Sequence, residues 1–161
     1  MLVPRPIEPT GEGDFRLRLS GAERTLLRSL PAELAEHIGA DADDPSLRRL
    51  FPPAYEGDDE GEAEYRGLVG DELVEGRLAA LRVVEETADR DRLSAEELDA
   101  WLRALTDLRL VLGTRLDVTE ETYVQALDPA GPQAYELSVF TYLSWLQEQL
   151  VEAAAGGLGP G

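Results

Sequence analysis

The chain has 161 residues, 33 acidic and 15 basic side chains, a formal net charge of −18 and no cysteine. The missing cysteines exclude disulfides, thiolate catalysis, cysteine metal ligands and redox sensing through a thiol. A charge of −18 repels phosphate groups, which argues against direct binding to nucleic acid or to an anionic membrane surface. The sequence shows neither a membrane-spanning apolar run nor a signal peptide, so we expect one cytoplasmic domain.

The N-terminal region predicts a lead-in that is loose or that becomes ordered on contact, followed by one strand. Residues 1–13 contain three prolines and two glycines, which suits an irregular segment. Residues 15–19 alternate strictly between apolar side chains and arginine, which is the period of a half-buried strand. A strand needs a partner for its backbone hydrogen bonds, and residues 2–3 and 116–118 are the candidates.

A helix is predicted from Ser20 to Gly39. Ser20 and Glu23 form a capping box, in which each side chain accepts a hydrogen bond from the backbone N–H of the other residue. Pro31 predicts a kink or a break, because proline lacks a backbone donor and crowds the preceding turn. The single histidine, His37, is interpreted as a helix-terminal cation or a surface residue, since one imidazole makes neither a two-histidine metal site nor a catalytic triad.

The middle of the chain predicts two more helices. A short helix begins at Asp44 and ends before Pro52. A longer helix follows an acidic run and extends from Tyr65 to Thr87. Three glycines weaken this helix, so it could form two pieces. The same small residues would let it pack against a copy of itself, which leaves a homodimer open.

The strongest structural signal is the segment from Leu93 to Leu116. Ser94 and Glu97 form a second capping box at its start. Apolar residues then recur every three or four positions along one face. They are Leu98, Trp101, Leu102, Leu105, Leu108 and Leu112. Gly113 is the residue type that commonly ends a helix, so we expect the helix to end there.

The C-terminal region predicts one further long helix. A short helical turn is expected over residues 119–127, and a helix with one apolar face extends from Pro132 to about Ala155. Residues 156–161 are rich in glycine and predict a flexible tail. Together the patterns predict a mainly α fold: one domain over residues 14–155, built as a bundle of four to six helices with a short N-terminal strand.

The sequence carries no strong catalytic or metal-binding motif. Its glycines fit neither a phosphate-binding loop nor a dinucleotide fingerprint, and it has no nucleophile elbow. Asp41, Asp43 and Asp44 resemble the start of a calcium loop, but the required glycine and terminal glutamate are missing. We therefore expect a protein that is not an enzyme and that uses neither a metal nor a cofactor.

Three charged residues of the central helix stand out because their neighbours are apolar. Asp107, Arg109 and Arg115 indicate either a structural clamp, in which arginine binds a carboxylate or a carbonyl of another helix, or a ligand site. The pattern favours the clamp. Trp101 and Trp145 lie on or beside apolar stripes, and both are interpreted as core residues rather than as binding hot spots.

Four segments together resemble a known family. They are FRLRLSGAE, DPSLRRLFPPAY, AWLRALTDLRLVLGTRLDVTEE and YLSWLQEQLVEAA, in this order between about Phe15 and Val151. The chain is similar to an actinobacterial family of unknown function whose genes often adjoin that of ClpS, the adaptor of the Clp protease. The resemblance implies a cytoplasmic, mainly helical domain without established catalytic residues, and some members are labelled transcriptional regulators. Thr106 replaces the asparagine of the family's ALNDLR pattern, so no role of that amide is carried over.

These observations lead to one hypothesis and one alternative. The hypothesis is a non-catalytic, regulatory protein-interaction module, associated with transcription or proteolysis, that binds a partner protein through an acidic face. The proposed contact residues form the most acidic run of the chain and are Asp58, Asp59, Glu60, Glu62 and Glu64. The alternative is a small ligand-binding protein or enzyme with a pocket near Arg109 and Arg115. The lack of a basic recognition helix argues against direct DNA binding.

Overall fold

The computed structural model describes residues 5–40, 60–116 and 134–157, without the side chains of residues 37, 39–40, 60–73 and 115–116. Within these ranges the chain is mainly helical, with a short antiparallel sheet near the N-terminus, which confirms the predicted fold class. The elements are β1 (Ile7–Pro9), β2 (Asp14–Leu17), α1 (Gly21–Ala40), α2 (Glu60–Thr87), β3 (Arg92–Ser94), α3 (Ala95–Leu116) and α5 (Ala134–Gly157).

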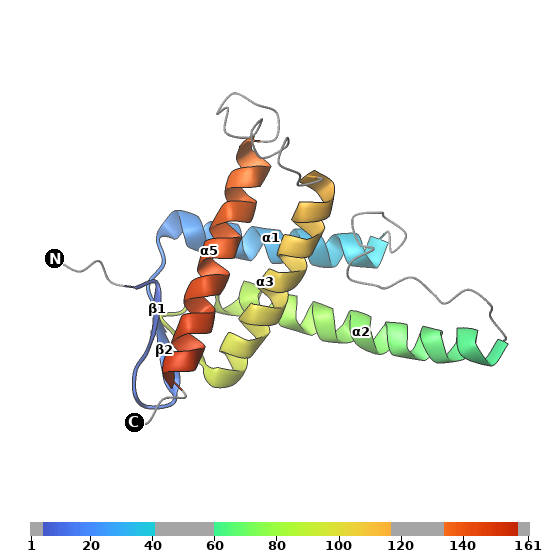
Figure 1. The fold of residues 1–161 in the computed structure, drawn as a ribbon, viewed down its shortest axis with the longest axis horizontal. Coiled ribbons are helices and arrows are strands. Elements are labelled where there is room, and N and C mark those ends of the chain that lie inside the picture. The colour runs from blue at the N-terminus through green and yellow to red at the C-terminus, as the bar shows by residue number, and fades with distance from the viewer. Residues whose placement is uncertain (1–4, 41–59, 117–133, 158–161) are drawn as a thin grey trace.

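The described helices form two antiparallel pairs that cross each other (Figure 1). α1 packs beside α2, α3 packs beside α5, and α2 also contacts α3. The sheet lies against α5 through its edge strand β1. Apolar side chains from the sheet and from all four of these helices form one core. Among the described helices, none combines the length and the apolar character needed to cross a membrane.

β2 is the central strand of the sheet, in the order β1–β2–β3. Ile7 of β1 lies opposite Leu17, and Leu93 of β3 lies opposite Phe15. These four side chains are buried, so one face of the sheet contributes to the core. The predicted strand is confirmed, but its predicted partners are wrong: β1 and β3 occupy both edges of β2, and Leu116 is the last residue of α3.

The description of residues 1–13 as a loose lead-in needs a correction for residues 7–9. These residues form β1, and the side chain of Ile7 is only 1% exposed. Burial of one isoleucine against the core and pairing with β2 are enough to order this short strand. Residues 1–4 lie outside the described part of the chain.

Both predicted capping boxes are present. The N–H of Ser20 donates to Glu23 Oε1 at 3.0 Å, and the N–H of Glu23 donates to Ser20 Oγ at 3.1 Å. Ser94 and Glu97 make the same two contacts at 2.8 and 3.1 Å. Each box satisfies two backbone donors that the first turn of a helix leaves free. Local sequence therefore fixes where α1 and α3 begin.

Two predicted interruptions of helices are absent. Of the kink or break predicted at Pro31, the break is wrong, because α1 continues through this residue. Leu27 and Leu34, about one turn before and after Pro31, are both buried in the core, so tertiary packing holds the helix on either side of the proline. α2 is one helix of 28 residues rather than two pieces.

The prediction that Gly113 ends the central helix is also wrong, because α3 continues to Leu116. Gly113 instead lies where α3 approaches α5. A Cβ atom at this position would lie 3.4 Å from Cε2 of Phe140, at the close end of van der Waals contact. The glycine therefore marks a close contact between helices and not a helix end.

The two tryptophans differ in their environment. Trp101 is fully buried, and its indole N–H donates to Thr87 Oγ1 at 2.7 Å, so it is a core residue as predicted. Trp145 is 42% exposed, which corrects its interpretation as a core residue. The short helices predicted at residues 44–51 and 119–127, and the side chain of His37, lie outside the described residues.

Candidate functional site

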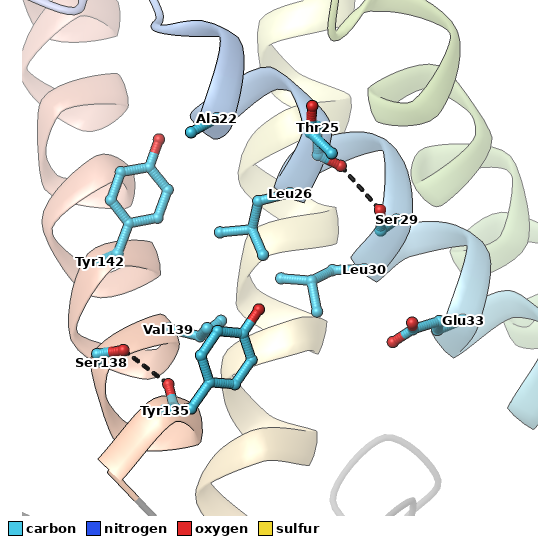
Figure 2. Close-up of a pocket in the computed structure, with 10 residues that line it drawn as sticks. All are labelled: Ala22, Thr25, Leu26, Ser29, Leu30, Glu33, Tyr135, Ser138, Val139 and Tyr142. Atoms are coloured by element: carbon cyan, nitrogen blue, oxygen red, sulfur yellow. Dashed lines mark hydrogen bonds between the residues drawn. The ribbon is translucent and has the colours of Figure 1, made fainter. Parts of the chain in front are cut away.

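A groove of about 530 Å³ lies between α1 and α5 (Figure 2). Leu26 and Leu30 of α1 and Val139 of α5 form its apolar floor. Leu26 and Leu30 are four residues apart, so they lie on the same side of α1. We call this feature the α1–α5 groove.

The groove exists because α1 and α5 each pack against a different helix. α1 packs mainly on α2 and α5 mainly on α3, whereas α1 and α5 touch each other only sparsely. Leu27 of α1 and Leu143 of α5 are fully buried in the core. Leu26 and Leu30, which lie on another side of α1, are only partly buried and remain available along the groove.

Aromatic side chains of α5 form one wall and extend it. Tyr135 and Tyr142 line the groove two turns apart, and Trp145 follows Tyr142 after one more turn. The rings of Tyr142 and Trp145 lie 5.9 Å apart between centroids. Tyr135 is 71% exposed. Tyrosine and tryptophan are enriched among the few residues that contribute most of the binding energy of protein–protein interfaces.

One hydrogen bond connects the two walls. The hydroxyl of Tyr142 donates to Glu23 Oε2 at 2.6 Å. Burial, together with the adjacent carboxylate of Glu23, raises the pKa of Tyr142. Burial also acts to raise the pKa of Glu23, but hydrogen bonds from Tyr142 and from Ser20 outweigh it and lower that pKa below its ordinary value. At neutral pH Tyr142 is therefore protonated and Glu23 is ionised.

The serine and threonine hydroxyls of the lining have already used their hydrogen atoms. Thr25 donates to the carbonyl of Gly21 at 3.0 Å, and Ser29 donates to the carbonyl of Thr25 at 2.9 Å. Ser138 donates to the carbonyl of Tyr135 at 2.7 Å. Each hydroxyl oxygen keeps lone pairs, so these positions offer the groove acceptors rather than donors.

The described lining contains an acidic residue, Glu33, and no basic one. Glu23 adds a second carboxylate beside Tyr142. Of the two arginines in the first turns of α1, Arg24 donates to backbone oxygens of the turn between α2 and β3. Arg28 pairs with Asp89 of that turn at 2.8 Å and also donates to Thr25 Oγ1 of the lining at 3.2 Å. The charge along the groove is therefore negative.

Asp107, one of the residues singled out in the sequence, lies between α2 and α3. Its side chain is 5% exposed and forms an ion pair with Arg77 of α2. Burial raises the pKa of Asp107, and the charge and hydrogen bond of Arg77 oppose this effect. Its position lies outside the lining of the α1–α5 groove.

Arg109 faces a different helix. Its Nε donates to Ser144 Oγ at 3.0 Å, and its Nη1 donates to Gln147 Oε1. The guanidinium also lies 5.7 Å from the ring centroid of Phe140, within reach of a cation–π contact. Asp107 therefore joins α3 to α2 while Arg109 joins α3 to α5, and the two do not meet. The side chain of Arg115 lies outside the described residues.

The acidic run proposed as a partner contact is described only in part. Asp58 and Asp59 lie outside the described residues. Glu60, Glu62 and Glu64 lie at the start of α2, with their side chains undescribed. In the described part of the chain, no group of three or more potential metal ligands gathers around one point.

The α1–α5 groove is not predicted from the sequence, where the helix from Pro132 to about Ala155 shows a single apolar face that includes Tyr135, Val139 and Tyr142. Val139 is 6% exposed, as expected of that face, but Tyr135 is not buried. The available signal was the series of residues 135, 138, 142 and 145, which lie on one helical face and read Tyr, Ser, Tyr, Trp. Such a mixed aromatic and polar face is typical of a binding surface.

Comparison with known proteins identifies relatives over most of the chain. AosR from Mycobacterium tuberculosis strain H37Rv, an oxidative stress regulator, is 32% identical over 130 residues, covering 70% of this chain and 59% of that protein. AosR from Mycobacterium bovis, also an oxidative stress regulator, gives the same values. A Mycobacterium leprae protein that also bears the name AosR is 33% identical over 129 residues, covering 69% of this chain and 58% of that protein.

The chain thus spans less than two thirds of the length of these curated relatives. No solved structure matches it. The model of a protein family, described as a domain of unknown function (DUF2017), matches residues 4–154. This match includes every strand and nearly all of every helix described above, and the chain belongs to the DUF2017 family.

Proposed function

We propose that this chain is a non-catalytic regulatory domain that acts by binding a partner protein in the α1–α5 groove. The names of the AosR relatives support a regulatory role. The chain has no cysteine, so a response to oxidation through its own thiols is not part of the proposal. Following the family resemblance, we propose partners that belong to transcription or to regulated proteolysis.

The observation that carries the proposal is the groove itself. An apolar floor, an aromatic wall and a polar rim are the parts of a protein-binding surface. Tyr135 occupies the edge of this floor with most of its side chain in solvent, and packing within the described residues does not account for that position. Contact with a partner would remove this apolar surface from water.

We propose that Asp107 and Arg109 act as structural clamps rather than as a ligand site. Asp107 is engaged by Arg77, and two nitrogens of Arg109 are engaged by side chains of α5. Both residues hold α3 against a neighbouring helix, which gives the rigid support that a binding groove between helices requires.

The acidic run at residues 58–64 has a separate place in the proposal, as the surface that attracts a basic partner. Exposed charges of this kind change the rate of association more than the rate of dissociation. We expect that replacing its five acidic residues by their amides slows association several-fold and leaves dissociation nearly unchanged. Surface plasmon resonance with the captured partner at two salt concentrations measures both rates. An unchanged association rate would remove this run from the proposal.

The test of the proposed function is capture of partners from an extract of the native host by the immobilised full chain, quantified by mass spectrometry. The variant is Tyr135→Ala and the matched control is Val151→Ala, because both side chains are large, apolar, exposed and on α5. Neither change removes a buried contact, and circular dichroism checks that both variants fold. Val151 is not part of the groove lining.

We expect the wild type and Val151→Ala to enrich the same protein, and Tyr135→Ala to lose it. Identical capture by all three proteins would contradict the assignment of the groove. Absence of any specifically enriched protein would contradict the proposed function as a whole.

A further inference from the structure

We infer that the occupant of the α1–α5 groove is an amphipathic helix of a partner protein that carries arginine or lysine beside its apolar face. This inference rests on the proposed function, and it adds the chemistry of the partner. It follows from three properties of the groove: its shape, the hydrogen-bonding capacity that its lining leaves unused, and its charge.

The shape of the groove suits a helix. Its lining on α1 extends from Ala22 to Glu33, which corresponds to roughly 16 Å at about 1.5 Å per residue, or three helical turns. Its two walls are themselves helices (Figure 2). A helix that lies in such a groove inserts side chains spaced by three, four and seven residues. The floor of Leu26, Leu30 and Val139 can receive two or three apolar side chains at this spacing.

The unused hydrogen-bonding capacity of the lining favours a partner that brings hydrogen-bond donors. The hydroxyls of Thr25, Ser29, Ser138 and Tyr142 donate within the chain, so their remaining capacity is to accept. Thr25 Oγ1 already accepts one hydrogen bond, from Arg28 Nη2 at 3.2 Å, and keeps one lone pair. Among the hydroxyl groups of the lining, the hydroxyl of Tyr135 donates to none of the described residues. A site for a small polar molecule needs several donors and acceptors that converge on it. Arginine and lysine side chains carry donors and no acceptor, and they match this rim.

The negative charge of the groove also favours arginine and lysine side chains in the partner. Glu33 lies on the rim, and Glu23, ionised at neutral pH, lies beside Tyr142. The charge also argues against a second copy of this chain as the occupant, because each copy carries a net charge of −18. A partner helix with basic flanks is attracted by the carboxylates and places its apolar face on the floor.

The experiment selects binders from a phage-displayed library of random peptides of about 15 residues, long enough for roughly four helical turns. The immobilised full chain is the bait, and peptides that also bind Tyr135→Ala are removed. We expect the enriched sequences to combine apolar residues at helical spacing with an excess of arginine and lysine. Enrichment of acidic or neutral peptides, of peptides without helical periodicity, or of no peptides at all would overturn the inference.

The affinities of the enriched peptides provide a second readout, with matched variants. Glu33→Gln, a variant that the selection does not use, is expected to weaken binding by roughly threefold, and this effect is expected to be lost at high salt. Val151→Ala is expected to leave binding unchanged. Trp145 reports on the same surface: it is 42% exposed and adjoins Tyr142, whereas Trp101 is fully buried. Its fluorescence is expected to shift on binding, and the shift is expected to disappear in Trp145→Phe.

The outcomes of the capture and peptide experiments distinguish the proposed function from the inferred chemistry of the partner. If Tyr135→Ala loses a natural partner while the selected peptides are not basic helices, the proposed function stands and the inferred chemistry fails. If the peptides are basic helices that depend on Tyr135 while host proteins are captured equally by Tyr135→Ala, the groove chemistry stands and its role in partner binding fails.

Discussion

The hydroxyl of Tyr142 and the carboxylate of Glu23 connect α5 to α1 at one end of the groove. We expect Tyr142→Phe to lower the free energy of unfolding by about 1–2 kcal/mol at pH 7, because a hydrogen bond to a charged group is lost. The folded-state pKa of Glu23 is below its ordinary value of 4.5, so this stabilisation is fully present above that pH. It is lost as the pH falls through the lowered folded-state pKa.

Chemical denaturation of both proteins between about pH 3 and about pH 7 measures the difference, over a range that begins about one unit below the ordinary carboxyl pKa values and extends well above them. Tyr135→Phe is the control, because its exposed hydroxyl contacts no carboxylate among the described residues. A difference between wild type and Tyr142→Phe that stays constant over this range would contradict the role assigned to Glu23.

The ion pairs of α3 test whether Asp107 acts as a clamp. Asp107 is 5% exposed, whereas Asp99, which pairs with Arg103 on the same helix at 3.1 Å, is 60% exposed. We expect Asp107→Ala to lower the free energy of unfolding by about 3 kcal/mol, because a buried ion pair is broken. We expect Asp99→Ala to have little effect, because water screens an exposed pair. Urea denaturation measures both free energies of unfolding. Equal losses for Asp107→Ala and Asp99→Ala would contradict the role of burial in the Asp107 ion pair.

At the scale of the element, two glycines with equally open surroundings are expected to respond in opposite ways to alanine. Gly76 lies inside α2 and Gly11 in the turn between β1 and β2, and a Cβ atom would meet no atom within 4 Å at either position. Gly76→Ala is expected to stabilise the protein by about 0.5–1 kcal/mol through helix propensity. Gly11 has a φ of +88°, so Gly11→Ala is expected to destabilise it by about 1 kcal/mol. The same sign for both in thermal unfolding would contradict this explanation.

The elements that could be predicted from the sequence are those whose signals are local. The capping boxes at Ser20 and Ser94 fix the starts of α1 and α3 through contacts three residues apart. β1 and β3 have three residues each, too few to show a period, and they form because the fold brings them to β2. The role of Gly113 could not be predicted from local signals either, because it depends on Phe140 of another helix.

At the scale of the whole molecule, the candidate site could not be predicted because it belongs to no single element. The groove arises where α1 and α5, whose lining residues are about a hundred or more positions apart in sequence, lie near each other without close packing. Each helix shows an apolar stripe in sequence, but periodicity does not tell which part of a stripe stays uncovered. Trp145 is an example, because it lies at the edge of the apolar stripe of α5 and outside the core.

The net charge of −18 is a property of the whole chain and makes the folded state repel itself. We expect added salt to stabilise the protein, because screening weakens this repulsion more than it weakens the exposed ion pairs. A gain of about 1 kcal/mol corresponds to a rise in Tm of roughly 3 °C for a domain of this size. Calorimetry between low salt and 0.5 M KCl, about the range over which screening saturates, measures it. A Tm that falls with salt would show that ion pairs dominate.

Hydrogen–deuterium exchange of the chain alone and in complex with its captured partner tests most directly whether the α1–α5 groove is the partner-binding surface. We expect slower exchange in the complex than in the chain alone over two separate segments, around residues 22–33 of α1 and 134–145 of α5, with little change over α3. Protection confined to other segments, such as residues 58–64, with α1 and α5 unchanged, would contradict it.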